Sequence, residues 1–177
     1  MFKARTLTET AIFVAIGVIG STFLAINIGP YRALFIQHLL NVILAVFYGT
    51  QRAVTVSFTV ALLRYLLGIG TLFAFPGGMI GACLAGLFYR MKPSIYTAIT
   101  GELIGTGLIA AVVSRQMSQL LTGEALSLFF FVPGFFVSSA TGSLIALLLY
   151  IKKGALLERV FKRAPMDFRT THDLTNS

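Results

Sequence analysis

The chain has 177 residues, of which 56% are hydrophobic and only 11% charged, whereas a typical soluble domain carries about 25% charged residues. A soluble domain could not hide this much apolar surface, so we expect an all-α integral membrane protein. The formal net charge of +8 is divided among short segments between apolar runs. This distribution is typical of the loops of membrane proteins and excludes a continuous nucleic-acid-binding patch.

Glycine, proline and charged residues divide the apolar sequence into segments that are candidates to cross a bilayer. The six helices predicted on this basis cover about residues 8–28, 33–48, 53–68, 77–90, 94–117 and 126–150. Gly29 and Pro30 end the first helix, which we expect to be retained because its apolar run is longer than that of a signal peptide and no clear cleavage site follows. Tyr31 and Arg32 form a short turn, and residues 49–52 form the next one.

Two of these helices come from one long apolar stretch. Residues 53–89 carry a single charge, Arg64, and are too long for one span. Glycines and a proline between residues 68 and 78 mark the division. Pro133 and Gly134 lie inside the last helix and predict a kink there.

An even number of helices places both termini on one side of the membrane. Most basic residues lie on that side, whereas the other side carries Arg32 and Arg115. The positive-inside rule therefore predicts that both termini are cytoplasmic. We divide the chain into a transmembrane domain, residues 1–151, and a basic tail, residues 152–177. The tail is either a short helix on the membrane surface or a solvated anchor up to residue 163, and is disordered after Pro165.

Polar side chains at membrane depth are costly and are candidates for function. Gln37, His38 and Asn41 are close neighbours on the second helix because three to four residues separate Asn41 from the other two. These residues and Arg64 fall in the outer halves of their helices, and Glu102 lies nearer mid-depth in the fifth. With nearby aromatic rings they predict an outward-facing pocket for a small ligand. The aromatic candidates are Tyr31, Phe73 and Phe75.

The same polar groups also have a purely structural interpretation. Gln37, His38, Asn41 and Arg64 would then bond between helices, with Arg64 neutralising Glu102. Both interpretations stay open from the sequence. The sequence contains neither a glycine-rich phosphate loop with a lysine nor a pair of intramembrane carboxylates, so we expect no enzyme activity, no metal and no cofactor. A chain of this size would need an energising partner for transport.

The first helix carries a candidate docking face for such a partner. Ala11 and Ala15 are four residues apart, and Thr8 lies one turn before Ala11. Small residues at this spacing let another helix approach closely.

Several segments resemble the ThiW family, the hydroxyethylthiazole-type substrate-binding (S) component of energy-coupling factor (ECF) transporters. The resemblance covers about residues 5–150. It is carried by TLTETAIFVAIGVIGS, IQHLLNVILAVFYG, LLRYLLGIGTLFAFPGGMIGACLAGLFYR and TGELIGTG. It implies a six-helix protein of the prokaryotic cytoplasmic membrane that partners with a membrane coupling protein (T component) and two ABC-type ATPases. The family's Ala-x-x-x-Ala motif, which contacts the coupling protein, corresponds here to Ala11 and Ala15.

The ligand that the resemblance implies is hydroxyethylthiazole, a small neutral heteroaromatic alcohol. Its ring would stack on the aromatic candidates, and its ring nitrogen would accept a hydrogen bond from Asn41, Gln37 or protonated His38. Its hydroxyl would reach Arg64 or Asn41. Two alternatives stay open, namely an S component for the pyrimidine precursor or thiamine, and a small oligomeric channel or exporter.

Overall fold

The computed structural model describes residues 4–28, 31–124 and 126–161. Its elements are α1 (Ala4–Phe23), β1 (Ile26–Ile28), β2 (Tyr31–Ala33), α2 (Phe35–Tyr48), α3 (Thr50–Leu66), α4 (Ala74–Met91), α5 (Ile95–Ile104), the π-helical turn η1 (Gly105–Ile109), α6 (Ala110–Thr122) and α7 (Leu128–Phe161). α5, η1 and α6 form one uninterrupted helix, Ile95–Thr122. The described residues therefore contain six helical rods, as the sequence predicted.

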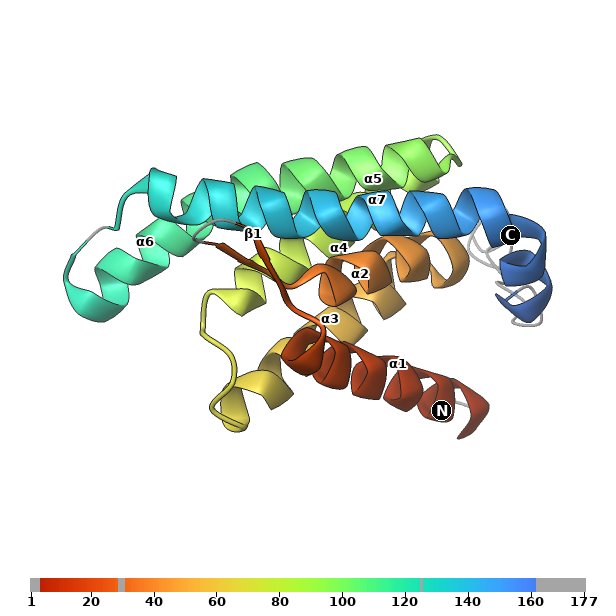
Figure 1. Cartoon of the computed structure of the whole chain (residues 1–177), viewed down its shortest axis with the longest axis horizontal. Helices are drawn as coiled ribbons and strands as arrows, with labels where there is room; N and C mark the ends of the chain where they lie inside the picture. The colour runs from red at the N-terminus through yellow and green to blue at the C-terminus, as the bar shows by residue number, and fades with distance from the viewer. Residues whose placement is uncertain (1–3, 29–30, 125, 162–177) are drawn as a thin grey trace, which may run out of the picture.

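The rods form an elongated bundle (Figure 1). α5 and α7 pack side by side along its length, α1 lies on the opposite side, and α2, α3 and α4 lie between them. The core surrounds α2, where Val42, Leu44 and Ala45 are almost fully buried. The start of α1 and the end of α7 lie at one end of the bundle, which we call the terminal end (Figure 1). The connection between α6 and α7 lies at the other end, which we call the far end.

The prediction that the first helix continues to residue 28 is wrong. α1 ends at Phe23, and β1 and β2 form a short antiparallel hairpin in which Ile26 is opposite Ala33. The predicted turn at Tyr31 and Arg32 is therefore part of a strand. Isoleucines at both ends of β1 favour extended backbone.

Three helix ends differ from the prediction. The turn predicted over residues 49–52 consists of Gly49 alone, whose positive φ of 83° lets the chain reverse at one residue. α4 begins at Ala74 because Pro76 is tolerated in the first turn of a helix, where no N–H is needed. The fifth rod continues to Thr122 and ends at Gly123, which has a left-handed conformation.

The last rod is longer than predicted. α7 continues without a break to Phe161, so the tail begins as part of this helix. Its contact with a membrane surface stays a prediction, as does the kink at Pro133. Residues 162–177, on which we expected disorder, lie outside the described part of the chain.

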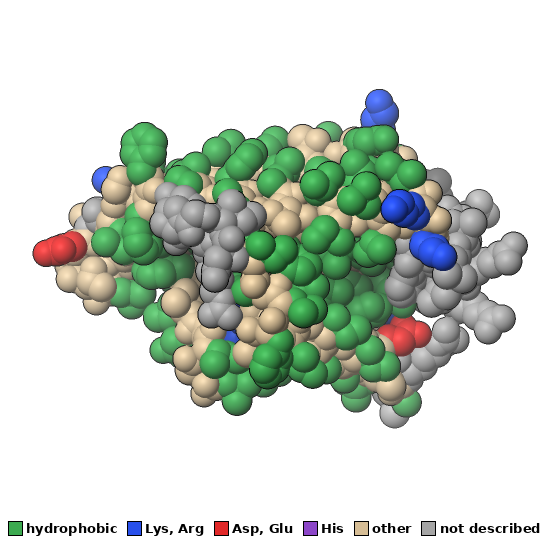
Figure 2. Space-filling view, in the orientation of Figure 1, with side chains coloured by type: hydrophobic (Ala, Val, Ile, Leu, Met, Phe, Trp, Pro, Cys, Tyr) green, Lys and Arg blue, Asp and Glu red, His purple; other side chains and the backbone are tan. Residues whose placement is uncertain are grey.

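The outer surface is apolar. Hydrophobic side chains cover the middle of the visible face, and most of its charged side chains lie toward the two ends (Figure 2). Three rods are long and apolar enough to cross a membrane, within Thr6–Phe23, Ile95–Thr122 and Leu128–Lys153, and α2 is a shorter apolar helix. The protein is thus built as a membrane protein.

Candidate functional site

A cavity of about 740 Å³ lies among α2, the α3–α4 connection and the first turns of α4 and α7. This is the size range of small-molecule sites. Its walls are mainly aromatic and glycine-rich, with a few polar side chains. The lining residues are Leu34, Gln37, His38, Arg64, Ile69, Gly70, Thr71, Phe73, Ala74, Gly77, Gly78, Leu126, Phe129, Phe130, Phe131, Gly134, Phe135 and Ser138.

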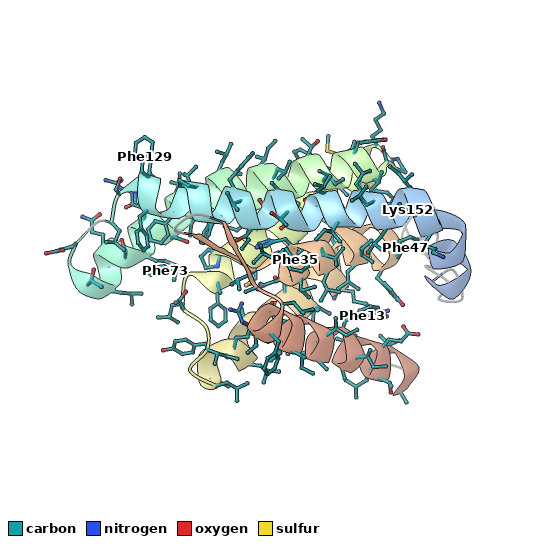
Figure 3. All side chains as sticks on the ribbon, in the orientation of Figure 1. Phe13, Phe35, Phe47, Phe73, Phe129 and Lys152 are labelled. Carbon is teal, nitrogen blue, oxygen red and sulfur yellow. The ribbon has the colours of Figure 1, made fainter. Side chains whose placement is uncertain are left out.

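The aromatic wall comes from α7 and from the residue before α4. The Phe73 ring packs edge-to-face on Phe131, with 5.0 Å between centroids, and Phe135 follows at 6.0 Å from Phe131. Edge-to-face packing of this kind holds rings in defined orientations. Figure 3 shows Phe73 and Phe129 toward the far end of the bundle, away from Lys152. The cavity therefore lies on the side of the core away from the basic terminal end.

Behind the cavity, a buried polar network connects α2, α4 and the fifth rod. Glu102 is fully buried, and its Oε1 lies 2.7 Å from Nδ1 of His38. Asn41 donates a hydrogen bond from Nδ2 to the same oxygen at 3.2 Å, and the Thr106 hydroxyl lies 2.9 Å from it. Three polar partners therefore meet one carboxylate oxygen, which holds the side chain in a single place.

Glycines of α4 make room for this network. A Cβ at Gly81 would overlap the hydroxyl of Thr106 and both carboxylate oxygens of Glu102. The backbone of α4 also takes part, because the Gly77 carbonyl accepts from Thr106 and the Gly78 carbonyl accepts from Asn41. The glycine-rich sequence of α4 is thus explained by close approach of neighbouring helices around a polar centre.

Arg64 stabilises a different part of the cavity wall. Although it lies in the last turn of α3, it is 96% buried. It donates from Nη1 to Oε1 of Gln37 at 3.2 Å and from Nη2 to the Ile69 carbonyl at 3.4 Å. These bonds tie the α3–α4 connection to α2.

The predicted site residues separate into groups. Gln37, His38, Arg64 and Phe73 line the cavity, whereas Asn41 and Glu102 lie one layer behind it. Phe75 does not line this cavity, and its ring packs edge-to-face on Phe58 and Tyr65 at 5.7 and 6.3 Å. Tyr31 lies in β2, and the placement of its side chain is outside the described part of the structure.

The predicted pairing of Arg64 with Glu102 is wrong for the described residues, because the side chain that meets Glu102 is His38, and Arg64 bonds to Gln37 and the Ile69 carbonyl. Residue spacing within each helix does not specify which polar groups of different helices meet, and here the glycines of α4 bring the fifth rod close to α2.

Sequence reasoning missed Thr106, Ser138 and Phe135. Thr106 follows Glu102 by four residues, a spacing that places both on one helix face and offered a usable signal. Ser138 lines the cavity and accepts a hydrogen bond from the Leu34 N–H at 3.3 Å. Phe135 stood among other phenylalanines, and nothing in the sequence separated it from them.

The candidate docking face on α1 is exposed. Ala11 and Ala15 are both accessible, whereas Val14 and Gly17 of the same helix are buried. An exposed small-residue face is what a docking helix requires.

Comparison with known proteins gives three results. Residues 7–154 match the family model described as thiamine-precursor transporter protein (ThiW). The structure is similar to one described as the S component of a bacterial ECF transporter, with a TM-score of 0.71 and 20% sequence identity over 88% of this chain and 98% of that one. At this identity the likeness shows that the two share a fold.

The third result concerns a phospho-N-acetylmuramoyl-pentapeptide-transferase of Gemmatimonas aurantiaca, which is 30% identical over 103 residues. The match covers 58% of this chain but spans only 27% of that relative. The family match, by contrast, covers most of the chain. The chain therefore belongs to the ThiW family of thiamine-precursor transporter proteins, which makes it a membrane transport protein and not an enzyme, as its sequence predicted.

Proposed function

We propose that this protein is the substrate-binding subunit of an ECF-type importer and that it captures hydroxyethylthiazole at the outer face of the cytoplasmic membrane for ATP-driven uptake. The observation that carries the proposal is the aromatic cavity into which Gln37, His38 and Arg64 project. Such a cavity suits a neutral heteroaromatic alcohol, because the rings pack against the ligand ring and the few polar groups orient its nitrogen and hydroxyl.

The charges around the cavity favour a neutral ligand over thiamine. Among the described lining residues Arg64 carries a positive charge and none is a carboxylate, because Glu102 lies behind His38. A ligand with a fixed positive charge would therefore enter a site that offers it no direct counter-ion. The pyrimidine precursor is also a neutral ring alcohol, and binding measurements must separate it from the thiazole.

The proposed membrane topology has six spans and both termini in the cytoplasm. Arg52 pairs with Glu9 near the start of α1, and Lys152 and Lys153 lie near the end of α7. Basic residues thus gather at the terminal end, where the positive-inside rule places the cytoplasm. The cavity then faces outward.

The proposed partners are a membrane coupling protein and two ABC-type ATPases. The sequence contains no nucleotide-binding motif, and the exposed Ala11 and Ala15 provide the face on which the coupling protein would dock.

Ligand-dependent thermal unfolding of the detergent-purified protein tests the ligand assignment. Cys83 is the single cysteine and is partly buried in α4, so a thiol-reactive dye reports its exposure on unfolding. Hydroxyethylthiazole at 100 times its Kd should stabilise the protein by about 2.7 kcal/mol, or raise the Tm by roughly 5–10 °C. At the same ligand concentration His38→Ala should reduce the shift by about half or more, whereas Leu148→Ala, on the exposed side of α7, should retain it.

A shift with the pyrimidine precursor or thiamine and none with the thiazole would refute the ligand assignment. Uptake is tested separately in cells that express the chain with and without an ECF coupling protein and its ATPases. Accumulation without these partners would favour the channel or exporter alternative and contradict the proposed mechanism.

A further inference from the structure

The hydrogen bonds around Glu102 determine which nitrogen of His38 carries a proton. The argument begins at Asn41, whose Nδ2 lies 3.0 Å from the Gly78 carbonyl and 3.2 Å from Oε1 of Glu102. A backbone carbonyl only accepts, so the atom of Asn41 that faces it must be the amide nitrogen. The second hydrogen of this nitrogen then points to Glu102, and Oε1 must accept it.

With Glu102 as a carboxylate, which can only accept, Oε1 is the acceptor toward His38 as well. The 2.7 Å contact between Oε1 and Nδ1 of His38 then requires the proton to lie on Nδ1. The fully buried hydroxyl of Thr106 has one hydrogen, which lies between the Gly77 carbonyl at 2.8 Å and Oε1 of Glu102 at 2.9 Å. Three separate helical segments thus fix one orientation of the imidazole ring.

The nitrogen left for the ligand is Nε2. It lies across the ring from Nδ1, on the side away from Glu102, and His38 lines the cavity. With the proton on Nδ1, the neutral ring presents a lone pair at Nε2. The imidazole is therefore a hydrogen-bond acceptor for the ligand.

The donors of the cavity are supplied by other residues. Gln37 receives a bond from Arg64 on Oε1, so the rest of its amide is a donor, and the Arg64 guanidinium has donors only. A ligand that fits this arrangement carries an acceptor, such as a ring nitrogen, and also a donor. Of the groups on a thiazole alcohol, only the hydroxyl is a donor.

We propose that Glu102 is a positioning residue that holds the His38 proton on Nδ1, so that Nε2 accepts a hydrogen bond from the hydroxyl group of the ligand. This inference rests on the proposed function and deepens it, because it makes a free hydroxyl the determinant of specificity. The substrate class is then neutral nitrogen heterocycles that bear an unmodified alcohol. The same compounds lacking the hydroxyl, or with the hydroxyl methylated, are poor ligands.

Nitrogen NMR of the whole protein in detergent tests the proton position without any ligand. The chain has only two histidines, His38 and His172, so ¹⁵N-histidine labelling gives two rings, and His172→Ala assigns them. We expect His38 to be neutral with its proton on Nδ1. Glu102→Gln preserves a carbonyl acceptor and should preserve this tautomer, whereas Glu102→Leu removes the acceptor and should release the proton to Nε2. A wild-type His38 protonated on Nε2, or on both nitrogens, would overturn the proposal.

Calorimetry tests the consequence for the ligand. Hydroxyethylthiazole should bind about tenfold more tightly than its deoxy and O-methyl analogues, the ratio expected for one buried hydrogen bond. Glu102→Gln should retain most of this ratio, and Glu102→Leu should reduce it to less than about threefold. If Glu102→Leu fails to fold, the proposal is still tested by two wild-type measurements, namely the affinity ratio between the alcohol and its analogues and the NMR spectrum of His38.

The two proposals fail in different ways. Equal binding of the thiazole alcohol and its deoxy analogue would overturn the role of His38 while the thiazole assignment stands. Binding of the pyrimidine alcohol alone, with the same dependence on its hydroxyl, would overturn the thiazole assignment and support the role of His38. If neither alcohol binds, the ligand assignment falls and the NMR result decides the role of Glu102.

Discussion

Replacing Gly81 with alanine adds one methyl group where α4 meets the Glu102 network. A Cβ at this position would lie 2.7 and 2.8 Å from the two carboxylate oxygens of Glu102 and still closer to the Thr106 hydroxyl. Overpacking of this kind costs about 1–3 kcal/mol, and each weakened hydrogen bond costs about 0.5–1.5 kcal/mol more. Alanine recovers about 0.8–1.0 kcal/mol through its higher helix propensity. We therefore expect a net loss of about 2 kcal/mol.

A loss of this size lowers the Tm by about 4–8 °C in a protein of this length. The thiol-dye assay on Cys83 measures it directly, since this residue is two positions away on α4. Gly77→Ala is the matched control, because its Cβ would only touch the Phe135 ring, at an ordinary distance of 3.5 Å. The control should keep or slightly raise the wild-type Tm.

Two results would refute this reasoning. Unfolding of Gly81→Ala at or above the wild-type temperature would mean that the network does not fill the space beside α4. An equal loss in Gly77→Ala would mean that any added methyl group on α4 is harmful, whatever it contacts.

Three further predictions use the same purified protein or the uptake assay. Asn41→Ala should weaken thiazole binding several-fold, as measured by calorimetry, because Glu102 loses a hydrogen-bond donor that fixes its position. Unchanged affinity in a folded variant would contradict this role of Asn41. Ala11→Trp and Ala15→Trp should leave ligand binding intact but block uptake, whereas the control Leu148→Trp, on the exposed side of α7, should leave both intact. If both alanine variants still co-purify with the coupling protein and support transport, the docking face is excluded. Glu9→Gln should reduce stability by at most about 1 kcal/mol, since its ion pair is partly exposed, and a larger loss of Tm would show stronger coupling of α1 to α3.

Much of the fold followed from local sequence. Long apolar runs and their glycine and proline breaks predicted the six helical rods, because bilayer thickness sets helix length and these residues interrupt helices. The hairpin of residues 26–28 and 31–33 was not predicted. Its apolar residues continue the pattern of the first helix, and only the pairing of the two strands, which is not a local property, distinguishes it.

The site was predicted in part for a similar reason. Polarity at membrane depth identified Gln37, His38 and Arg64 as cavity residues, because buried polar groups in apolar helices are rare. Their partners depend on helix packing. The pairing of Glu102 with His38 requires the fifth rod to approach α2 past the glycines of α4, and no pattern within one helix contains that information.

The π-helical turn η1 has a consequence for how this helix tolerates changes in length. A π turn holds one more residue than an α-helical turn. Deleting one residue within Gly105–Ile109 would let the rod become α-helical throughout, and α6 would keep its rotation relative to the rest of the bundle. Deleting one residue after Ala110 would instead rotate the following part of α6 by about 100°, turning the buried Ser114 and Ser118 toward lipid. The turn thus absorbs a length mutation that the neighbouring helix cannot.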